Sequence, residues 1–290
     1  MKTSKEVTQV YKGSKPNMVG DGFRVQNLFP RGNRIGKAIS PFFLLDYAAP
    51  VYFPPTDKAR GVDQHPHRGF ETVTIVYQGA LEHRDSTGAY GKLREGDVQW
   101  MTAASGIVHE EKHETEFSRK GGTIEMAQLW VNLPKAHKMN KPGYQTLLRE
   151  DIPVKSWEDG SQLRVIAGEF EGLYGPARTF TPINVYDVQL KMGRNITIKL
   201  PEGYNTGIVV LKGEAEFNET HISKEVEIVS FGNEGEEINI TAVSDVSLLV
   251  LNGEPINEPV FAYGPFLMNT QEEITQAIQD YSEGRLGRLN

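Results

Sequence analysis

The chain has 290 residues, with 31 Lys and Arg against 38 Asp and Glu, a formal charge of −7, seven His and no Cys. The lack of cysteine excludes disulfide frameworks, thiolate zinc sites, iron–sulfur clusters and cysteine nucleophiles, so a bound metal would need His, carboxylate or carbonyl ligands. The acidic balance argues against direct nucleic-acid binding, and the length allows one large domain or two.

The sequence shows no secretory signal, and no apolar run reaches the roughly 18 residues that a membrane helix needs. We therefore expect a cytoplasmic protein that does not bind a membrane. We also expect it to be a monomer.

Short alternating or β-branched runs, separated by Gly, Pro, Asn and Asp, dominate the chain. This pattern predicts a sandwich or barrel of many β-strands. The clearest expected strands are residues 72–77, 81–84, 98–101, 124–133, 184–190, 207–211 and 247–251.

One helix is expected near the end of the chain. Thr270 and Glu273 have the spacing of a capping box, and Gly284 stops the helical pattern. The helix should dock on a sheet by one apolar face, formed by Ile274, Ala277, Ile278 and Tyr281.

The two halves of the chain show a weak internal repeat. An apolar strand, a glycine and a further strand occur around Gly79 and again around Gly213, 134 residues later. This offset is close to half the chain, so we infer two copies of one β-domain. The polar, proline-containing stretch 134–153 is the predicted linker between them.

Five of the seven histidines lie between positions 65 and 113. His65 and His67 are two residues apart, so on a strand both side chains point to the same face and could bind one ion. His109 and Glu111 form a second pair with this spacing. If the two strands cross, three imidazoles and a carboxylate would suit an octahedral divalent metal with open positions. Glu71 lies an even number of positions from His65 and His67, so on a continuous strand it would point to the same face as they do.

Other residues near these histidines have more ordinary interpretations. His83 is expected to be a hydrogen-bonded core residue, and the alternative is that it lines the barrel near the metal. His113 is expected on the surface, and the alternative is that it is a metal ligand. Trp100 and Trp130 are expected in the barrel core.

Several longer motifs resemble those of a known family. They occupy residues 41–46, 65–73, 96–103, 106–109, 128–133 and 261–266. These motifs closely resemble the pirin family of bicupins. The resemblance implies an all-β fold of two cupin-type β-barrels (a bicupin) with a C-terminal helix. It places an N-terminal cupin domain with the metal site at 1–137 and a C-terminal cupin domain at 138–290.

The resemblance also implies a ligand set. Pirins place the carboxylate ligand two residues after the third histidine, which indicates one metal held by His65, His67, His109 and Glu111. In many other cupins the carboxylate comes from the first motif, here Glu71, so Glu71 is either a ligand or a partner that orients a ligand imidazole. The expected metal is Fe(II), with Mn, Ni, Cu, Co or Zn as alternatives.

The second domain departs from this ligand pattern. Adding the offset of 134 to the three histidines leads to Lys199, Pro201 and Val243, and His221 is the only histidine in that region. We therefore expect the C-terminal barrel to bind no metal.

Activity associated with pirins implies a metal-dependent dioxygenase of the quercetinase type. Such an enzyme opens the ring of a small aromatic, flavonol-like substrate with O₂ and releases carbon monoxide, and Glu111 would be the catalytic general base. The alternative is a metal- or redox-sensing regulatory protein that binds a transcription factor or a metabolic enzyme, as pirins are also described. A protein partner suits the acidic surface better than nucleic acid does.

Overall fold

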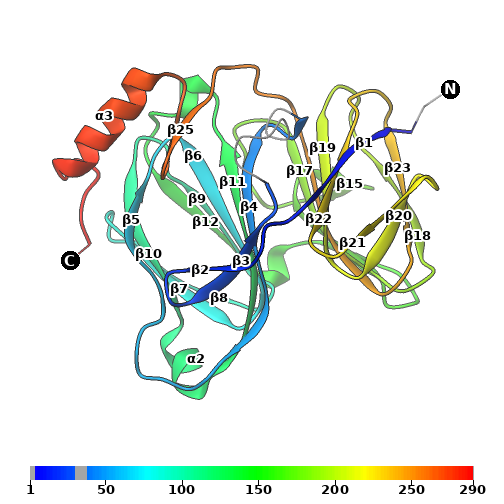
Figure 1. Ribbon diagram of the computed structural model, residues 1–290, viewed down its shortest axis with the longest axis horizontal. Helices are drawn as coiled ribbons and strands as arrows, with labels where there is room; N and C mark the ends of the chain where they lie inside the picture. The colour runs from blue at the N-terminus through cyan, green and yellow to red at the C-terminus, as the bar shows by residue number, and fades with distance from the viewer. Residues whose placement is uncertain (1–3, 30–37, 290) are drawn as a thin grey trace. The chain divides into compact units, whose positions relative to one another are not determined.

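The computed structural model describes residues 4–29 and 38–289, and most of its elements are β-strands (Figure 1). The chain forms two units, each with its own barrel. The first barrel comprises Pro16–Gln26, Leu45–Arg149 and the described part of Ile256–Asn290. The second barrel comprises the described parts of Met1–Lys15, Asn27–Leu44 and Glu150–Pro255.

The first barrel consists of two antiparallel sheets. The seven-stranded sheet has the order β12 (Gly143–Leu147), β9 (Val98–Thr102), β6 (Phe70–Gln78), β11 (Gly122–Asn132), β4 (Phe42–Phe53), β3 (Phe23–Asn27) and β2 (Asn17–Val19). The four-stranded sheet has the order β5 (Gly61–His67), β10 (Ile107–His113), β7 (Ala80–Asp85) and β8 (Tyr90–Arg94). Helix α2 (Thr115–Lys120) connects β10 to β11.

The second barrel has the same two-sheet design. Its seven-stranded sheet has the order β1 (Val7–Lys12), β22 (Glu227–Phe231), β19 (Asn205–Lys212), β24 (Val246–Gly253), β17 (Ile183–Leu190), β14 (Gln162–Ala167) and β13 (Val154–Ser156). Its four-stranded sheet has the order β18 (Asn195–Lys199), β23 (Glu237–Ala242), β20 (Glu214–Phe217) and β21 (His221–Lys224).

A two-stranded hairpin completes each unit. The second barrel carries the hairpin of β15 (Glu169–Phe170) and β16 (Leu173–Tyr174), and the first carries that of β25 (Phe261–Tyr263) and β26 (Phe266–Met268). One 3₁₀ turn, Lys135–His137, precedes the crossing into the second barrel, and another, Arg149–Asp151, lies at the crossing itself.

The expected strands and the repeat are confirmed. Each range predicted from the sequence coincides, within a few residues, with β6, β7, β9, β11, β17, β19 or β24. Gly79 connects β6 to β7 with φ +89°, and Gly213 connects β19 to β20 with φ +77°. Both turns use backbone angles that favour glycine, so the repeat reflects the same turn in two barrels.

The division of the chain differs from the predicted boundary at residues 137 and 138. Stretch 134–153 was predicted to be a linker, but part of it forms β12, which pairs with β9 of the first barrel. Described parts of the N-terminal region already belong to the second barrel. After β12 the chain passes into it again at Glu150, and it returns to the first barrel at Ile256. The polar composition of this stretch reflects an edge strand whose residues are partly exposed.

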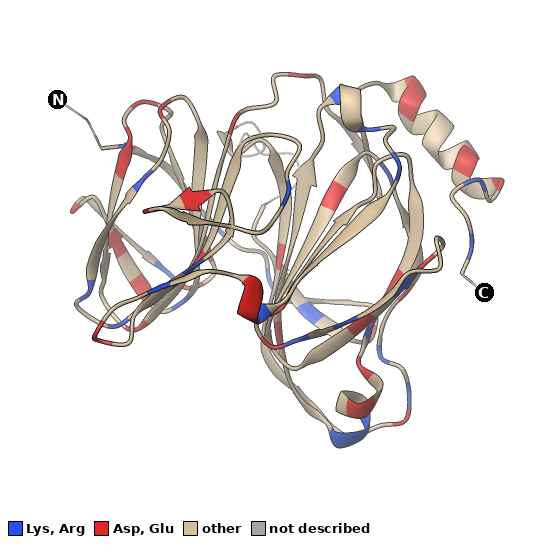
Figure 2. Ribbon diagram, turned by 180° about the vertical axis from the view of Figure 1, so that it is seen from behind, with Lys and Arg blue, Asp and Glu red and all other residues tan. Residues whose placement is uncertain are grey.

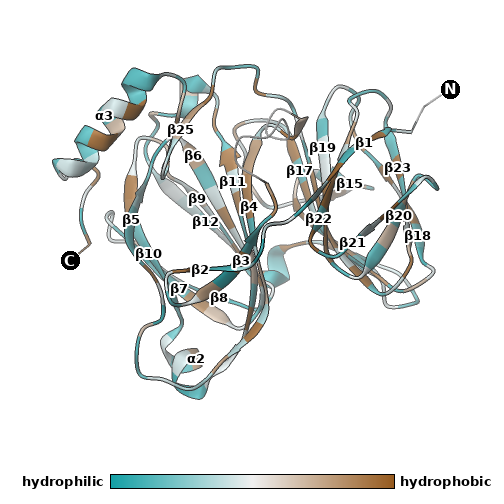
Figure 3. Ribbon diagram, viewed as in Figure 1, coloured by the Kyte–Doolittle hydropathy of each residue, from teal (hydrophilic) through white to brown (hydrophobic). Residues whose placement is uncertain are grey.

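Helix α3 (Gln271–Ser282) begins at the predicted capping box, with Thr270 as its N-cap. The apolar face is narrower than expected. Ile274 and Ala277 are buried, whereas Ile278 and Tyr281 are each 41% exposed, and Figure 3 shows hydrophilic and hydrophobic residues along the helix. No α-helix within residues 4–29 and 38–289 has the length and apolar character needed to cross a lipid bilayer.

Candidate metal centre

Two neighbouring strands of the first barrel bring three histidines together. His65 and His67 lie on β5, and His109 lies on the adjacent strand β10, directly opposite His65 in the register. Their ring centroids are 4.3 to 4.9 Å apart. One nitrogen from each ring lies within 4.8 Å of the others, which is a spacing that could hold a metal ion.

The buried nitrogens of this cluster lack partners. His67 and His109 are buried, and neither Nδ1 of His67 nor either ring nitrogen of His109 has a hydrogen-bond partner in the structure. Burial and the neighbouring histidines hold the pKa of both imidazoles well below the ordinary value. Neutral imidazoles with free lone pairs are what a divalent metal binds, so these residues fit a metal ion.

His65 completes the group from a half-buried position. Its Nδ1 lies 2.8 Å from the carbonyl oxygen of Asp63, and a hydrogen bond from Nδ1 would leave Nε2 as the lone-pair donor. Backbone acceptors of this kind commonly orient metal-binding imidazoles.

Glu111 lies on β10 with the same parity as His109, and both side chains are buried. Its carboxylate, however, is not part of the three-histidine group. Instead, Nε2 of Gln128 donates to both of its oxygens, at 2.9 and 2.8 Å, and Thr74 Oγ1 donates to Oε1 at 3.4 Å. The assignment of Glu111 as a ligand stays a prediction.

Glu71 also lies outside the three-histidine group. It is buried on β6, where it accepts a hydrogen bond of 2.6 Å from Thr102 Oγ1. Burial raises the pKa of its carboxyl to about 7, although the hydrogen bond from Thr102 opposes the shift. The bond observed for Glu71 therefore connects two strands of the sheet, β6 and β9, and does not orient an imidazole.

An aromatic wall packs beside the histidines. Phe70 and Trp130 stack with ring centroids 4.2 Å apart, and each has an edge contact with the ring of His67, at 5.1 and 5.3 Å. Trp100 is buried, as expected for a core residue. Trp130 borders the candidate centre and limits the space around His67.

The barrel interior also contains polar residues, of which Gln99 and Gln128 carry no prediction from the sequence. His83 of β7 is opposite Glu111 in the register and stacks on Tyr144. Gln99 Nε2 donates a 2.8 Å hydrogen bond to Nε2 of His83. The expectation that His83 is a hydrogen-bonded core residue is confirmed. Gln99 and Gln128 each interrupt an apolar strand, and this interruption was the signal that could have identified them.

The prediction that His113 lies on the surface is wrong. Its ring is buried and has edge contacts with Phe23, Phe53 and Phe117, and its Nε2 lies 2.8 Å from the carbonyl oxygen of Gly22. Strand β10 extends to His113, so the alternation that points His109 inward also points His113 inward, at the other end of the strand.

The interior of the second barrel is apolar. Large side chains such as Tyr186, Phe217 and Phe231 pack there with many aliphatic residues. His221 lies on the edge strand β21, near Ser223 Oγ.

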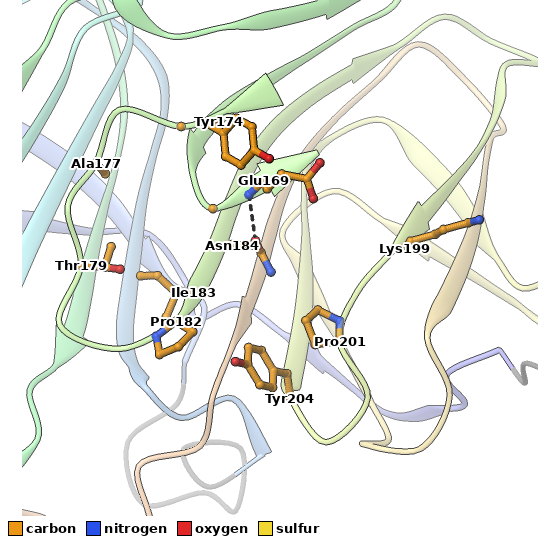
Figure 4. A pocket seen from close by; sticks show the side chains of 12 residues that line it. Glu169, Tyr174, Ala177, Thr179, Pro182, Ile183, Asn184, Lys199, Pro201 and Tyr204 are labelled. Atoms are coloured by element: carbon orange, nitrogen blue, oxygen red, sulfur yellow. Dashed lines mark hydrogen bonds between the residues drawn. The ribbon is translucent and has the colours of Figure 1, made fainter. Parts of the chain in front are cut away.

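A cavity of about 490 Å³ opens on the second barrel (Figure 4). Tyr174 and Tyr204 lie on either side of Asn184 in this view. Asn184 accepts from the backbone N–H of Glu169 at 3.2 Å and donates to Asn252 at 2.7 Å, so its amide is already paired. We therefore place the candidate chemistry in the first barrel.

Comparisons with known proteins agree with this architecture. Residues 22–131 match the family model for pirin, and residues 185–287 match the model for the pirin C-terminal cupin domain. A Pseudomonas aeruginosa protein named "Putative quercetin 2,3-dioxygenase" is 52% identical over 99% of this chain and 100% of its own length. Pirin-like protein 2 of Arabidopsis thaliana is 40% identical over 92% of this chain and 81% of its own.

Solved structures show the same fold. The crystal structure of a quercetin 2,3-dioxygenase from Acinetobacter baumannii has a TM-score of 0.97 and 48% identity, covering 99% of this chain and 100% of that one. A bacterial pirin from Escherichia coli in complex with nickel(II) has a TM-score of 0.64 and 19% identity, covering 86% and 100%. The second likeness concerns the fold alone.

Proposed function

The chain belongs to the pirin family of bicupins, and we propose that it is a metal-dependent dioxygenase of the quercetinase type. The observation that carries the proposal is the group formed by His65, His67 and His109, with buried ring nitrogens that lack partners. The names of the similar Pseudomonas and Acinetobacter proteins support a flavonol-like substrate and O₂ as the reactants.

One divalent metal would be held by the three histidines, and we propose Glu111 as the fourth ligand, as in the family pattern. Nitrogen and oxygen donors suit iron(II), manganese, nickel, copper, cobalt or zinc, and we propose iron(II). Three neutral imidazoles and one carboxylate would leave a net charge of +1 on a divalent ion, which favours an anionic enolate. When bound, the metal supplies a template and electronic activation for the substrate and O₂.

Glu111 is the proposed general base. Its carboxylate would take the proton of the flavonol 3-hydroxyl, which makes the substrate electron-rich enough to react with O₂. Gln128 donates to both of its oxygens and fixes the plane of the carboxylate. Phe70 and Trp130 would exclude water from the reacting group, because their rings cover one side of His67.

The test begins with metal analysis of protein purified without oxygen. Oxygen uptake and carbon monoxide release are then measured with quercetin, with His109→Ala as the control. We expect the wild-type protein to bind about one metal ion per chain and the His109→Ala variant to bind none. Oxygen uptake and carbon monoxide release should occur with the wild type only. Bound metal without turnover of quercetin or another catechol-like compound would overturn the enzyme proposal and favour the regulatory alternative.

A further inference from the structure

The C-terminal segment 256–289 returns to the first barrel and contacts the strands that carry the three histidines. Figure 1 shows helix α3 beside β25 at the edge of this barrel. Residues next to two of the histidines, Arg68 and Val108, contact the segment directly, and Gln64, next to His65, lines a small cavity with Tyr281 and other C-terminal residues.

Arg68 follows His67 and forms an ion pair with α3. Its Nη1 donates to Asp280 Oδ2 at 2.7 Å, and its Nε donates to the carbonyl oxygen of Ser105 at 2.7 Å. The two side chains of the pair are only 5% and 14% exposed. The arginine therefore connects three parts of the chain: the end of β5, the turn before β10 and helix α3.

The backbone of Arg68 is held by the same C-terminal segment. Its N–H donates to the carbonyl oxygen of Pro265 at 3.3 Å, and its carbonyl oxygen accepts from the N–H of Leu267 at 3.0 Å. Both backbone groups of the residue after His67 are thus paired with the β25–β26 hairpin. This double pairing restricts the backbone that orients the His67 imidazole.

A second connection reaches the strand of His109. Ser86 Oγ accepts from the N–H of Val108 at 3.1 Å and donates to the carbonyl oxygen of Leu286 at 2.8 Å. Val108 also packs in an apolar cluster with Ile274 and Leu286. The residue before His109 is therefore held from the same C-terminal segment as the residue after His67.

We propose that Arg68 and Asp280 are positioning residues of the metal centre, which hold His67 and the turn leading to His109 in the arrangement that binds metal. The inference rests on the metal site of the proposed function and is independent of which reaction follows. Pre-organised imidazoles bind a metal more tightly because less conformational freedom is lost on binding. Helix α3 contains acidic residues and no Lys or Arg (Figure 2), so the positive charge of Arg68 meets only acidic charges on this helix.

Two single substitutions separate positioning from simple electrostatics. Asp280→Asn removes a negative charge near the centre, and Arg68→Gln removes a positive one. If only charge mattered, the first would weaken and the second would strengthen the binding of a cation. If the pair positions the ligands, both substitutions weaken the binding of the cation. The double variant should then bind the cation no more weakly than the weaker-binding single variant, because both substitutions break the same interaction.

The measurement is an anaerobic titration of metal-free full-length protein with Co²⁺, followed by calorimetry and by the visible absorption of the bound ion. We expect about tenfold weaker binding in each single variant, with an altered Co²⁺ spectrum. The matched control is Asp187→Asn, which breaks the buried Arg164–Asp187 pair of the second barrel, 3.2 Å long. It should lower stability and leave Co²⁺ affinity and spectrum unchanged.

Unchanged affinity in both variants, or opposite changes in the two, would overturn the positioning role while leaving the metal site intact. A wild-type protein that binds no Co²⁺ would overturn the metal site itself and the proposed function with it. If the single variants do not fold, Ser86→Ala applies the same test, since it breaks only the milder connection between Val108 and Leu286. Unchanged Co²⁺ affinity in that variant would count against the proposal.

Discussion

Gln128 donates a hydrogen bond to each carboxylate oxygen of Glu111, at 2.9 Å to Oε1 and 2.8 Å to Oε2. The two residues lie on different sheets of the first barrel, β11 and β10. The carboxylate is thereby held in a defined orientation inside the barrel, on the same strand as His109. This held carboxylate is the one that we propose as the general base.

Glu111→Gln should lower the turnover of a flavonol by a factor on the order of 10² to 10⁴, the usual contribution of a general base. The substitution keeps the size of the side chain and removes its ability to accept the proton. Steady-state oxygen uptake measures the effect. Glu110→Gln is the control because its side chain points to the opposite face of β10. Equal turnover in the two variants would exclude Glu111 as the base.

His109→Ala and His113→Ala should differ in their effect on metal binding, although the two residues share one face of β10. His109→Ala should abolish metal binding. His113→Ala should keep the metal and lower the free energy of unfolding by about 2–4 kcal/mol, since it removes a large buried ring from its contacts with three phenylalanines. Metal analysis and urea unfolding separate the two. Loss of metal in both variants would contradict this assignment.

Glu71 should make the metal-free protein less stable as the pH rises. The pKa of its buried carboxyl is about 7 in the folded state, against an ordinary value of 4.5. Between these values the folded state holds a proton that the unfolded state has lost, so the free energy of unfolding falls as the pH rises from 4.5 through 7, by about 3 kcal/mol in total. Urea unfolding at pH 5 to 8 measures this. Glu71→Gln should flatten the dependence, and an identical slope in that variant would refute the prediction.

Gly91→Ala should disturb the packing of His83. A Cβ at this position would lie 2.5 Å from Cε1 of the buried His83 ring, which is itself stacked on Tyr144. We expect the free energy of unfolding to fall by about 1–3 kcal/mol, as for other overpacked sites. Gly143→Ala, where a Cβ meets nothing within 4 Å, is the matched control in the same barrel. Equal thermal stability of the two variants would contradict the expected clash.

Much of the fold could be predicted because it depends on local patterns. Alternation of apolar and polar residues identified the strands, and the glycine turns at Gly79 and Gly213 revealed the repeat, since both need a positive φ. The Thr270–Glu273 capping box located the start of α3 for the same reason: each bond joins residues three positions apart. The side chains of Ile278 and Tyr281 are exposed, although helical periodicity placed them on the apolar face. Periodicity predicts the direction in which a helix docks, but not the width of the face that becomes buried.

The sequence by itself determined which residues could meet at a metal, because the spacing of two residues in His65–His67 and His109–Glu111 places each pair on one face of a strand. Only the tertiary structure decided how these pairs combine. The register of β5 and β10 sets His65 opposite His109, while Gln128 from the other sheet holds Glu111. The contact of Asp280 with Arg68 joins positions 212 residues apart, and no local pattern encodes a partner at that distance because only the folded barrel brings the two side chains together.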